Sequence, residues 1–153
     1  MNVMSKQPPY HFPLFVDLQG KRLVVVGGGT IARRRIDSLL PFGGDLVVIA
    51  TSLKGSGDGF TWLARRYEPG DLEGAFLAVA ATDDREVNRQ VGEEAKALGI
   101  PVSVCDRKEE CTFFFPALCE GNGLIAGVVS RGADHHLTAR AAKAIRRTLE
   151  ELE

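Results

Sequence analysis

A glycine-rich turn between a short apolar run and a helical pattern is the feature that most constrains how this chain folds. Residues 21–35 read KRLVVVGGGTIARRR, in which four apolar residues lead directly into three glycines. The arrangement Gly27-x-Gly29-x-x-Ala32 is one form of the dinucleotide fingerprint. Its first glycine turns the chain off the strand, its second admits a pyrophosphate, and its small third residue lets helix and strand pack closely. The stretch therefore predicts a strand, a tight turn and a helix whose N-terminus faces a dinucleotide.

Apolar strands and amphipathic helices alternate over the first two thirds of the chain. Apolar runs at residues 46–50, 76–81 and 100–105 are typical of buried strands, and residues 62–67 predict a short third strand. Apolar residues recur with helical spacing after the glycines and again over residues 87–98. Asp83 is the predicted N-cap of the second helix, with a ligand contact as the alternative interpretation. This alternation predicts right-handed βαβ units and a parallel sheet covered by helices.

The pattern changes in the last third of the chain. Residues 112–118 and 124–129 flank a Glu-Gly-Asn-Gly turn and predict a β-hairpin, and residues 137–153 predict a helix with one apolar face. The predicted fold class is α/β, a Rossmann-type parallel sheet followed by a small hairpin and helix. We expect a flexible leader at residues 1–9, the Rossmann domain at 10–111, and a hairpin-plus-helix segment at 112–153. Each part of that segment needs a partner surface, which favours dimerisation through it.

Composition narrows the class of protein and of partner. The chain has 153 residues, 44% hydrophobic and 25% charged, with a formal net charge of -1. That balance gives no reason to expect a nucleic acid or an anionic membrane as partner. The apolar runs are far shorter than the roughly 20 residues that span a bilayer. Three cysteines without CxxC spacing argue against a disulfide framework or a zinc site, so a reducing cytoplasm is the expected compartment.

Ligands of open α/β sheets bind beyond the carboxyl ends of the strands, which locates the candidate cofactor residues. The second strand ends without the acid that holds the ribose hydroxyls of NAD, and neutral hydroxyls take its place. On chemistry alone the choice between NAD and NADP stays open. The candidate cofactor-binding residues are Gly27, Gly29, Thr30, Ile31, Thr51, Ser52, Ala81 and Thr82.

Asp106 is the candidate catalytic residue because it ends an apolar strand at this edge of the sheet. A carboxylate partly removed from water can move a proton in a reaction near neutral pH. The alternative interpretation is a loop cap that bonds nearby backbone N–H groups. Cys105, at the same strand end, is interpreted as a small core residue.

Two charged stretches carry weaker functional interpretations. The adjacent residues His135 and His136 point about 100 degrees apart on a helix, so they do not form a ready metal site. The arginines at residues 33–35 are interpreted as a solvated helix face, with the alternative that one of them meets an anionic substrate.

Three stretches together resemble one known family. These are HFPLFVDLQGKRLVVVGGGTIARRRIDSLL, FLAVAATDDREVN and IPVSVCDRKEECTFFFPAL. In order and spacing they are similar to the precorrin-2 dehydrogenase/sirohydrochlorin ferrochelatase family, the N-terminal module of siroheme synthase. The resemblance runs from about Tyr10 to the final helix. A departure from the family pattern lies at residues 130–136.

The resemblance implies NAD-dependent dehydrogenation of precorrin-2 to sirohydrochlorin, a step toward siroheme. It implies that Asp106 is catalytic, in dehydrogenation and, in bifunctional members, in insertion of Fe²⁺ or Co²⁺. It also implies cofactor contacts at Thr30, Ile31, Thr51 and Ser52, and a homodimer formed through the segment after the Rossmann domain. Bound NAD would take the hydride, and Asp106 would take the proton.

Two alternatives belong to other function classes. One is a non-catalytic module that binds NAD(H) or a tetrapyrrole. The other is a chelatase alone, which inserts a metal into sirohydrochlorin with the help of His135 or His136. Turnover of precorrin-2 with NAD separates the leading hypothesis from both.

Overall fold

The structure, a computed structural model, describes residues 10–132 and 134–152, so the predicted leader at residues 1–9 lies outside the described residues. The described chain forms two compact units. One comprises residues 17–114, and the other comprises residues 10–16 together with residues 115–132 and 134–152. Residues 10–16, which the sequence analysis assigns to the Rossmann domain, thus group with the C-terminal segment.

Five parallel strands form the sheet of the larger unit, in the order β3-β2-β1-β4-β5. The parallel Rossmann-type sheet predicted from the sequence is confirmed. The strands within the runs predicted at residues 76–81 and 100–105 are shorter than expected at both ends, because the outer residues of each run belong to the flanking turns. The strands are β1 (Arg22–Val26), β2 (Asp45–Ile49), β3 (Thr61–Leu63), β4 (Leu77–Ala80) and β5 (Val102–Val104).

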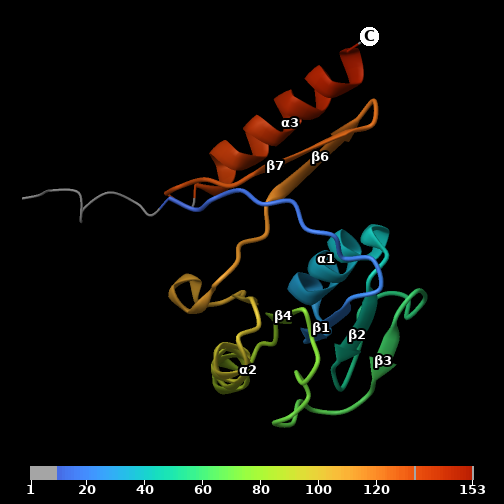
Figure 1. Ribbon diagram of the computed structural model, residues 1–153, viewed down its shortest axis with the longest axis vertical. Helices are drawn as coiled ribbons and strands as arrows, with labels where there is room; N and C mark the ends of the chain where they lie inside the picture. The colour runs from blue at the N-terminus through green and yellow to red at the C-terminus, as the bar shows by residue number, and fades with distance from the viewer. Residues whose placement is uncertain (1–9, 133, 153) are drawn as a thin grey trace, which may run out of the picture. The chain divides into compact units, whose positions relative to one another are not determined.

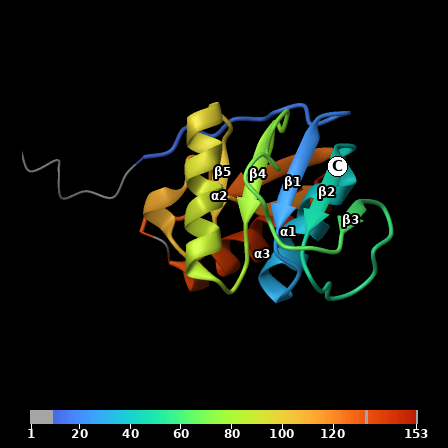
Figure 2. The ribbon, with the colours of Figure 1, turned by 90° about the horizontal axis from the view of Figure 1, so that it is seen from below.

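Two helices cover opposite faces of this sheet. Alternate residues of a strand point to opposite faces, and Val24 and Val26 of β1 lie in one core cluster with Val91 and Ala95 of α2 (Arg85–Leu98). Helix α1 (Thr30–Leu39) buries its own apolar stripe. Because β2 and β5 lie on opposite sides of the β1–β4 pair, right-handed crossovers place α1 and α2 on different faces. Figure 2 shows α2 in front of the sheet.

Short 3₁₀ turns complete the larger unit. Helix α1 leads into η2 (Leu40–Phe42), and the chain turns at Gly43, which has a φ of 75°. After β5, η3 (Lys108–Glu110) returns the chain toward the strand, where the Thr112 hydroxyl accepts a hydrogen bond from the Val102 N–H at 2.9 Å.

All five strands end in register. Val26 pairs with both Ile49 and Ala80, Ile49 pairs with Leu63, and Ala80 pairs with Val104. The loops that follow the strands therefore start from one common edge. The strand order reverses between β1 and β4, and this is the position where open α/β sheets bind their ligands.

The smaller unit is an antiparallel hairpin covered by one helix. Strands β6 (Ala117–Gly121) and β7 (Leu124–Val128) meet at Asn122 and Gly123, both with positive φ, as a two-residue hairpin turn requires. Helix α3 (His135–Glu151) lies along the hairpin in Figure 1, with Cys119 and Ala142 buried between them.

The hairpin and the final helix predicted from the sequence are confirmed, with shifted bounds. Strand β6 begins at Ala117 instead of residue 112, since the preceding residues turn back to β5 and end in Pro116, which has no N–H for a ladder. Helix α3 begins at His135, where Asp134 caps it by accepting the Leu137 N–H at 3.0 Å. Across the described residues, no helix is both long and apolar enough to cross a membrane.

Candidate cofactor site

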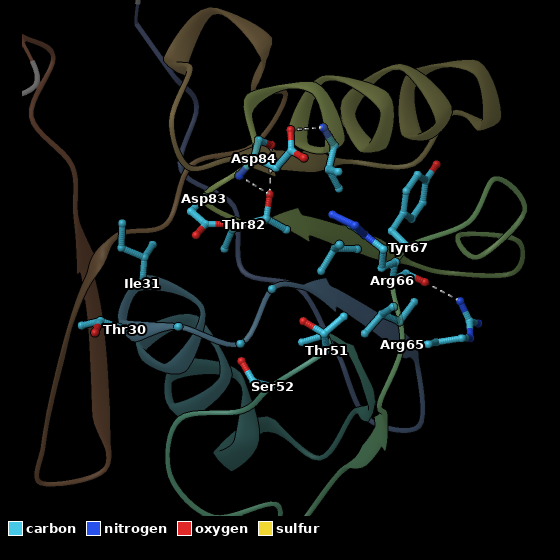
Figure 3. Close-up of a pocket in the computed structure, with 18 residues that line it drawn as sticks. Thr30, Ile31, Thr51, Ser52, Arg65, Arg66, Tyr67, Thr82, Asp83 and Asp84 are labelled. Atoms are coloured by element: carbon cyan, nitrogen blue, oxygen red, sulfur yellow. Dashed lines mark hydrogen bonds between the residues drawn. The ribbon is translucent and has the colours of Figure 1, made fainter.

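A cavity of about 460 Å³ lies at the carboxyl edge of the five-stranded sheet. Figure 3 shows its lining side chains converging from the segments that follow β1, β2, β3 and β4. The structure brings all the sequence-predicted cofactor residues together in this cavity wall. They are Gly27, Gly29, Thr30, Ile31, Thr51, Ser52, Ala81 and Thr82.

The first two glycines of the turn are required by the backbones around them. Gly27 has a φ of 128°, and a Cβ there would lie 2.3 Å from the Ala81 carbonyl oxygen. A Cβ on Gly28 would lie 1.9 Å from the carbonyl oxygen of Ser52. The fingerprint treats Gly28 as a variable position, so sequence reasoning missed this requirement. Close packing of the turn against the loops after β2 and β4 fixes its shape.

Gly29 differs from its two neighbours because it faces open space. A Cβ on Gly29 would meet nothing within 4 Å, and Gly29 is the N-cap of α1. Helix α1 has no side-chain cap and no acidic residue in its first turn, whereas Asp84 caps α2 and Asp134 caps α3. The first N–H groups of a helix have no partner within the helix. The start of α1 is therefore an open donor site for an anion.

Lys54 adds a positive charge beside this helix start. Its ammonium donates to the Thr30 hydroxyl at 2.9 Å, and its backbone N–H donates to the Gly28 carbonyl at 2.7 Å. The loop after β2 is thus joined to the glycine turn by one residue at two points. A cation at this place favours binding of a phosphate group.

The segment after β3 forms a wall of the cavity that sequence reasoning missed. Arg65, Arg66 and Tyr67 line it, and Arg65 forms two hydrogen bonds of 2.9 Å with the Asp71 carboxylate. The Arg65 guanidinium holds the pKa of Asp71 below its usual range. Burial, and a hydrogen bond to Glu94, raise the pKa of Tyr67. The missed signal is positional: these residues lie within the stretch 62–67 that the sequence predicts as a strand, but β3 (Thr61–Leu63) ends before them.

The cap of α2 differs from the prediction. Asp84, not Asp83, is the N-cap, and its carboxylate accepts from the backbone N–H groups of Glu86 at 3.0 Å and Val87 at 3.4 Å. The backbone of Thr82 is fixed by the buried Asn88, whose amide accepts the Thr82 N–H and donates to the Thr82 carbonyl, both at 3.0 Å. The predicted capping role of Asp83 is wrong because the helix begins one residue later than that role requires.

Asp106 follows β5 and is held by an arginine that the sequence analysis did not single out. The Arg85 guanidinium lies 3.0 Å from the Asp106 carboxylate and 2.5 Å from that of Glu110. The Asp106 side chain is exposed, and Asp106 is absent from the lining of the cavity. The structure places Asp106 at the same edge of the sheet as the cavity, one strand beyond β4.

Other candidate side chains have mainly structural surroundings. Cys105 is half-buried, and burial raises the pKa of its thiol. Arg33 forms an ion pair with Asp37 at 2.9 Å and donates a hydrogen bond to the Ser56 carbonyl. Of the three arginines at residues 33–35, only Arg34 is exposed, as a solvated helix face requires. Within residues 10–132 and 134–152, no group of three or more His, Cys, Asp or Glu side chains is placed to hold a metal ion.

Comparison with known proteins assigns the family. Residues 14–117 match the family model described as putative NAD(P)-binding. The chain belongs to this NAD(P)-binding family. This match confirms the prediction that the cofactor is a nicotinamide dinucleotide.

Two relatives with curated names extend the likeness. The chain is 43% identical over 143 residues to the probable multifunctional siroheme biosynthesis protein HemA of Ruminiclostridium josui, covering 89% of this chain and 28% of that protein. It is 41% identical over 140 residues to the siroheme synthase of Pseudomonas putida, covering 88% of this chain and 30% of the relative. The chain thus spans less than a third of the length of either relative. The resemblance to the siroheme synthase family is confirmed.

A solved structure shares the fold. SirC, a precorrin-2 dehydrogenase, superimposes with a TM-score of 0.73 and 26% sequence identity. The superposition covers 90% of this chain and 71% of SirC.

The cavity fits the dinucleotide that the family binds. Gly29 presents no side chain where a pyrophosphate would approach, and the uncapped start of α1 supplies donors for it. Thr51 and Ser52 supply hydroxyls at the end of β2, where a ribose is held in such sheets. Space, donors and polar partners are therefore present in one cavity.

Proposed function

We propose that this chain catalyses the NAD-dependent dehydrogenation of precorrin-2 to sirohydrochlorin in siroheme biosynthesis. The observation that carries the proposal is the likeness to SirC, a precorrin-2 dehydrogenase, over 90% of this chain. The similarity to siroheme synthases and the cavity beside the glycine turn support the same reaction.

The roles of the residues follow from their places at the sheet edge. The backbone of Gly29, Thr30 and Ile31 holds the pyrophosphate at the start of α1, while Thr51 and Ser52 hydrogen-bond a ribose. These contacts orient the bound dinucleotide across the ends of β2, β1 and β4. When bound, the dinucleotide supplies the acceptor for the hydride.

Asp106 receives the proton in this proposal. Removing two hydrogens from the tetrapyrrole as a hydride and a proton leaves the proton for a base at the cleft, and Asp106 is the carboxylate at the end of β5. Arg85 is a positioning residue, because its ion pair at 3.0 Å fixes where the Asp106 carboxylate lies.

The test is NADH formation, followed by absorbance, from NAD⁺ and precorrin-2. We expect turnover by the wild-type protein and a fall in kcat of about 10²–10⁴-fold in Asp106→Asn, because the base is removed. The affinity of Asp106→Asn for NAD⁺ should stay at the wild-type value, since Asp106 is absent from the cavity wall. Full turnover by Asp106→Asn would remove Asp106 from the mechanism. Tight binding of NAD⁺ and precorrin-2 without turnover would instead favour a binding module.

We further propose that the active protein is a cytoplasmic homodimer joined through the smaller unit. Cys119 and its partner Ala126 share the hairpin face that α3 covers, so the neighbouring residues Leu118, Ile125 and Val129 occupy the other face. Ile125 and Val129 are exposed apolar side chains. A second copy of this chain would cover them.

A further inference from the structure

Two adjacent carboxylates that follow β4, those of Asp83 and Asp84, have different contacts. Asp84 is committed to α2, because it accepts from the Glu86 and Val87 N–H groups, and its own N–H donates to the Thr82 hydroxyl at 3.1 Å. The Asp83 side chain makes none of these hydrogen bonds. Within residues 10–132 and 134–152, no hydrogen bond or ion pair is found for its side chain.

Asp83 presents its charge to the cofactor cavity. It is exposed and belongs to the cavity wall. Figure 3 draws the Asp83 carboxylate on the side of Ile31, away from α2, whereas that of Asp84 points toward the start of the helix. A carboxylate that keeps its negative charge unpaired beside a binding cavity selects for positive charge in the ligand.

The sheet determines which half of a dinucleotide meets Asp83. In the proposed binding mode, the pyrophosphate would lie at the start of α1 after β1, and the adenosine ribose would meet the hydroxyls of Thr51 and Ser52 after β2. Strand β4 lies on the opposite side of β1 from β2. The nicotinamide nucleoside would therefore extend over the end of β4, which Asp83 follows.

The cations that line the cavity lie at the β3 end of the same sheet edge. Arg65 and Arg66 follow β3, which is two strands from β1 in the direction away from β4, and Arg65 is paired with Asp71. Arg85 follows Asp84 but is paired with both Asp106 and Glu110, so the end of β4 carries net negative charge. The ring of oxidised nicotinamide is a cation, whereas the reduced ring is neutral.

We propose that Asp83 is the counter-charge for the nicotinamide ring, which shifts the relative affinity of the site toward the oxidised dinucleotide. The inference rests on the proposed path of the dinucleotide across the sheet edge and is independent of the tetrapyrrole reaction. Because Asp83 stabilises bound NAD⁺ more than bound NADH, it favours replacement of the reduced dinucleotide by the oxidised one and lowers the reduction potential of the bound dinucleotide.

The experiment compares NAD⁺ and NADH binding to the full chain by calorimetry, for the wild-type protein and Asp83→Asn. Asparagine keeps the size of the side chain and one acceptor oxygen and replaces the other oxygen with an amide NH2, so the substitution removes the charge without removing the side chain. We expect Asp83→Asn to weaken NAD⁺ binding about tenfold and NADH binding by less than about twofold. In the wild-type protein, added salt should reduce the preference that Asp83 creates.

Asp84→Asn is the matched control. Asp84 also lines the cavity, but its carboxylate is bonded to the first N–H groups of α2. Asp84→Asn removes the same charge and retains a cap acceptor, so the ratio of NAD⁺ to NADH affinity should stay near the wild-type ratio. An equal loss of both affinities in Asp83→Asn, no loss of either, or the same change of ratio in Asp84→Asn would overturn the proposal. The binding measurements test the role of Asp83, and the precorrin-2 assay tests the proposed reaction. If Asp83→Asn changes the ratio of NAD⁺ to NADH affinity as expected but the wild-type protein does not turn over precorrin-2, only the proposed reaction is refuted.

Discussion

Each glycine of the Gly27-Gly28-Gly29 turn has a different physical reason to lack a side chain. Gly27 needs a backbone with a φ of 128°, Gly28 needs contact with the Ser52 carbonyl, and Gly29 leaves room in the cavity. The first two reasons concern the folded protein by itself, and the third concerns the ligand. Substitutions can therefore separate folding from cofactor binding within one turn.

We predict that Gly28→Ala and Gly29→Ala fail in different ways. The new Cβ of Gly28→Ala would lie 1.9 Å from the Ser52 carbonyl oxygen, which should cost about 1–3 kcal/mol of unfolding free energy and lower the Tm. Gly29→Ala should keep a Tm close to that of the wild-type protein and weaken NAD⁺ binding at least about tenfold, because its Cβ occupies ligand space. Thermal unfolding and calorimetry measure the two effects. A Gly29→Ala protein with wild-type NAD⁺ affinity would place the pyrophosphate elsewhere.

Sequence reasoning reached the cofactor residues because strand ends are readable from apolar runs. Gly27, Thr51 and Thr82 each follow such a run, and parallel strands bring their ends together. The division of labour between Asp83 and Asp84 was not readable, since it depends on where α2 begins to within one residue. The partner of Asp106 was also hidden, because Arg85 approaches it only once α2 has packed against the sheet.

At the scale of the elements, the segment after β3 shows how a short strand supports a binding wall. Residues 62–67 were predicted as a strand, but β3 is Thr61–Leu63 and the next residues turn into the cavity wall. Asp71 holds this segment by accepting from Arg65 and from the Glu68 N–H at 2.7 Å. One carboxylate therefore organises the loop that carries Arg66 and Tyr67.

We predict that the contribution of Asp71 to stability depends on pH. The pKa of Asp71 is lowered in the folded protein by the hydrogen bonds from Arg65, so its contribution is fully present above the unfolded value of about 3.9 and is lost as pH falls through the folded value. Asp71→Asn should lower the Tm at neutral pH, and the difference from the wild-type Tm should shrink as pH falls below about 3.9. Thermal unfolding across this range gives the comparison.

Glu68→Gln is the control for Asp71→Asn. Glu68 is exposed and lies 4.0 Å from Arg65, so its removal should barely change the Tm. A Tm difference for Asp71→Asn that stays constant from neutral to acid pH would show that the carboxylate charge has no part in the stabilisation.

At the scale of the whole molecule, the chain forms one unit around a cofactor cavity and another with an apolar hairpin face. The outer face of the hairpin contains Ile125 and Val129, both exposed. We predict that Ile125→Lys converts the proposed dimer into a monomer, because a buried, unpaired ammonium opposes association. Light scattering at micromolar concentration measures the mass.

The control for that variant adds the same charge elsewhere. Gln90 is exposed on α2 of the larger unit, so Gln90→Lys should leave the mass unchanged. A monomeric wild-type protein, or an Ile125→Lys protein that remains dimeric, would exclude the hairpin as the contact between subunits.

The order of the elements was predictable from sequence, and the division into units was not. Apolar runs and helical spacing lie within short stretches, so β1, α1, β4 and α2 were recognisable locally. The grouping of residues 10–16 with the C-terminal segment joins chain ends more than a hundred residues apart. Contacts such as the Arg131 guanidinium stacked 3.3 Å from the centre of the Tyr10 ring leave no local pattern in the sequence.

The missing side-chain cap of α1 predicts that the stability of the protein depends on the supply of its cofactor. A dinucleotide phosphate at that helix start would accept hydrogen bonds from the first N–H groups of α1, as the Asp84 carboxylate does for α2. Binding would then stabilise the folded state by about 2.7 kcal/mol when the dinucleotide concentration is a hundredfold above Kd. Amides in the first turn of α1 then exchange with solvent faster in the free protein than in the complex. Proteases that attack opened chains would remove molecules without cofactor first, so a cell would retain the copies that are ready to work.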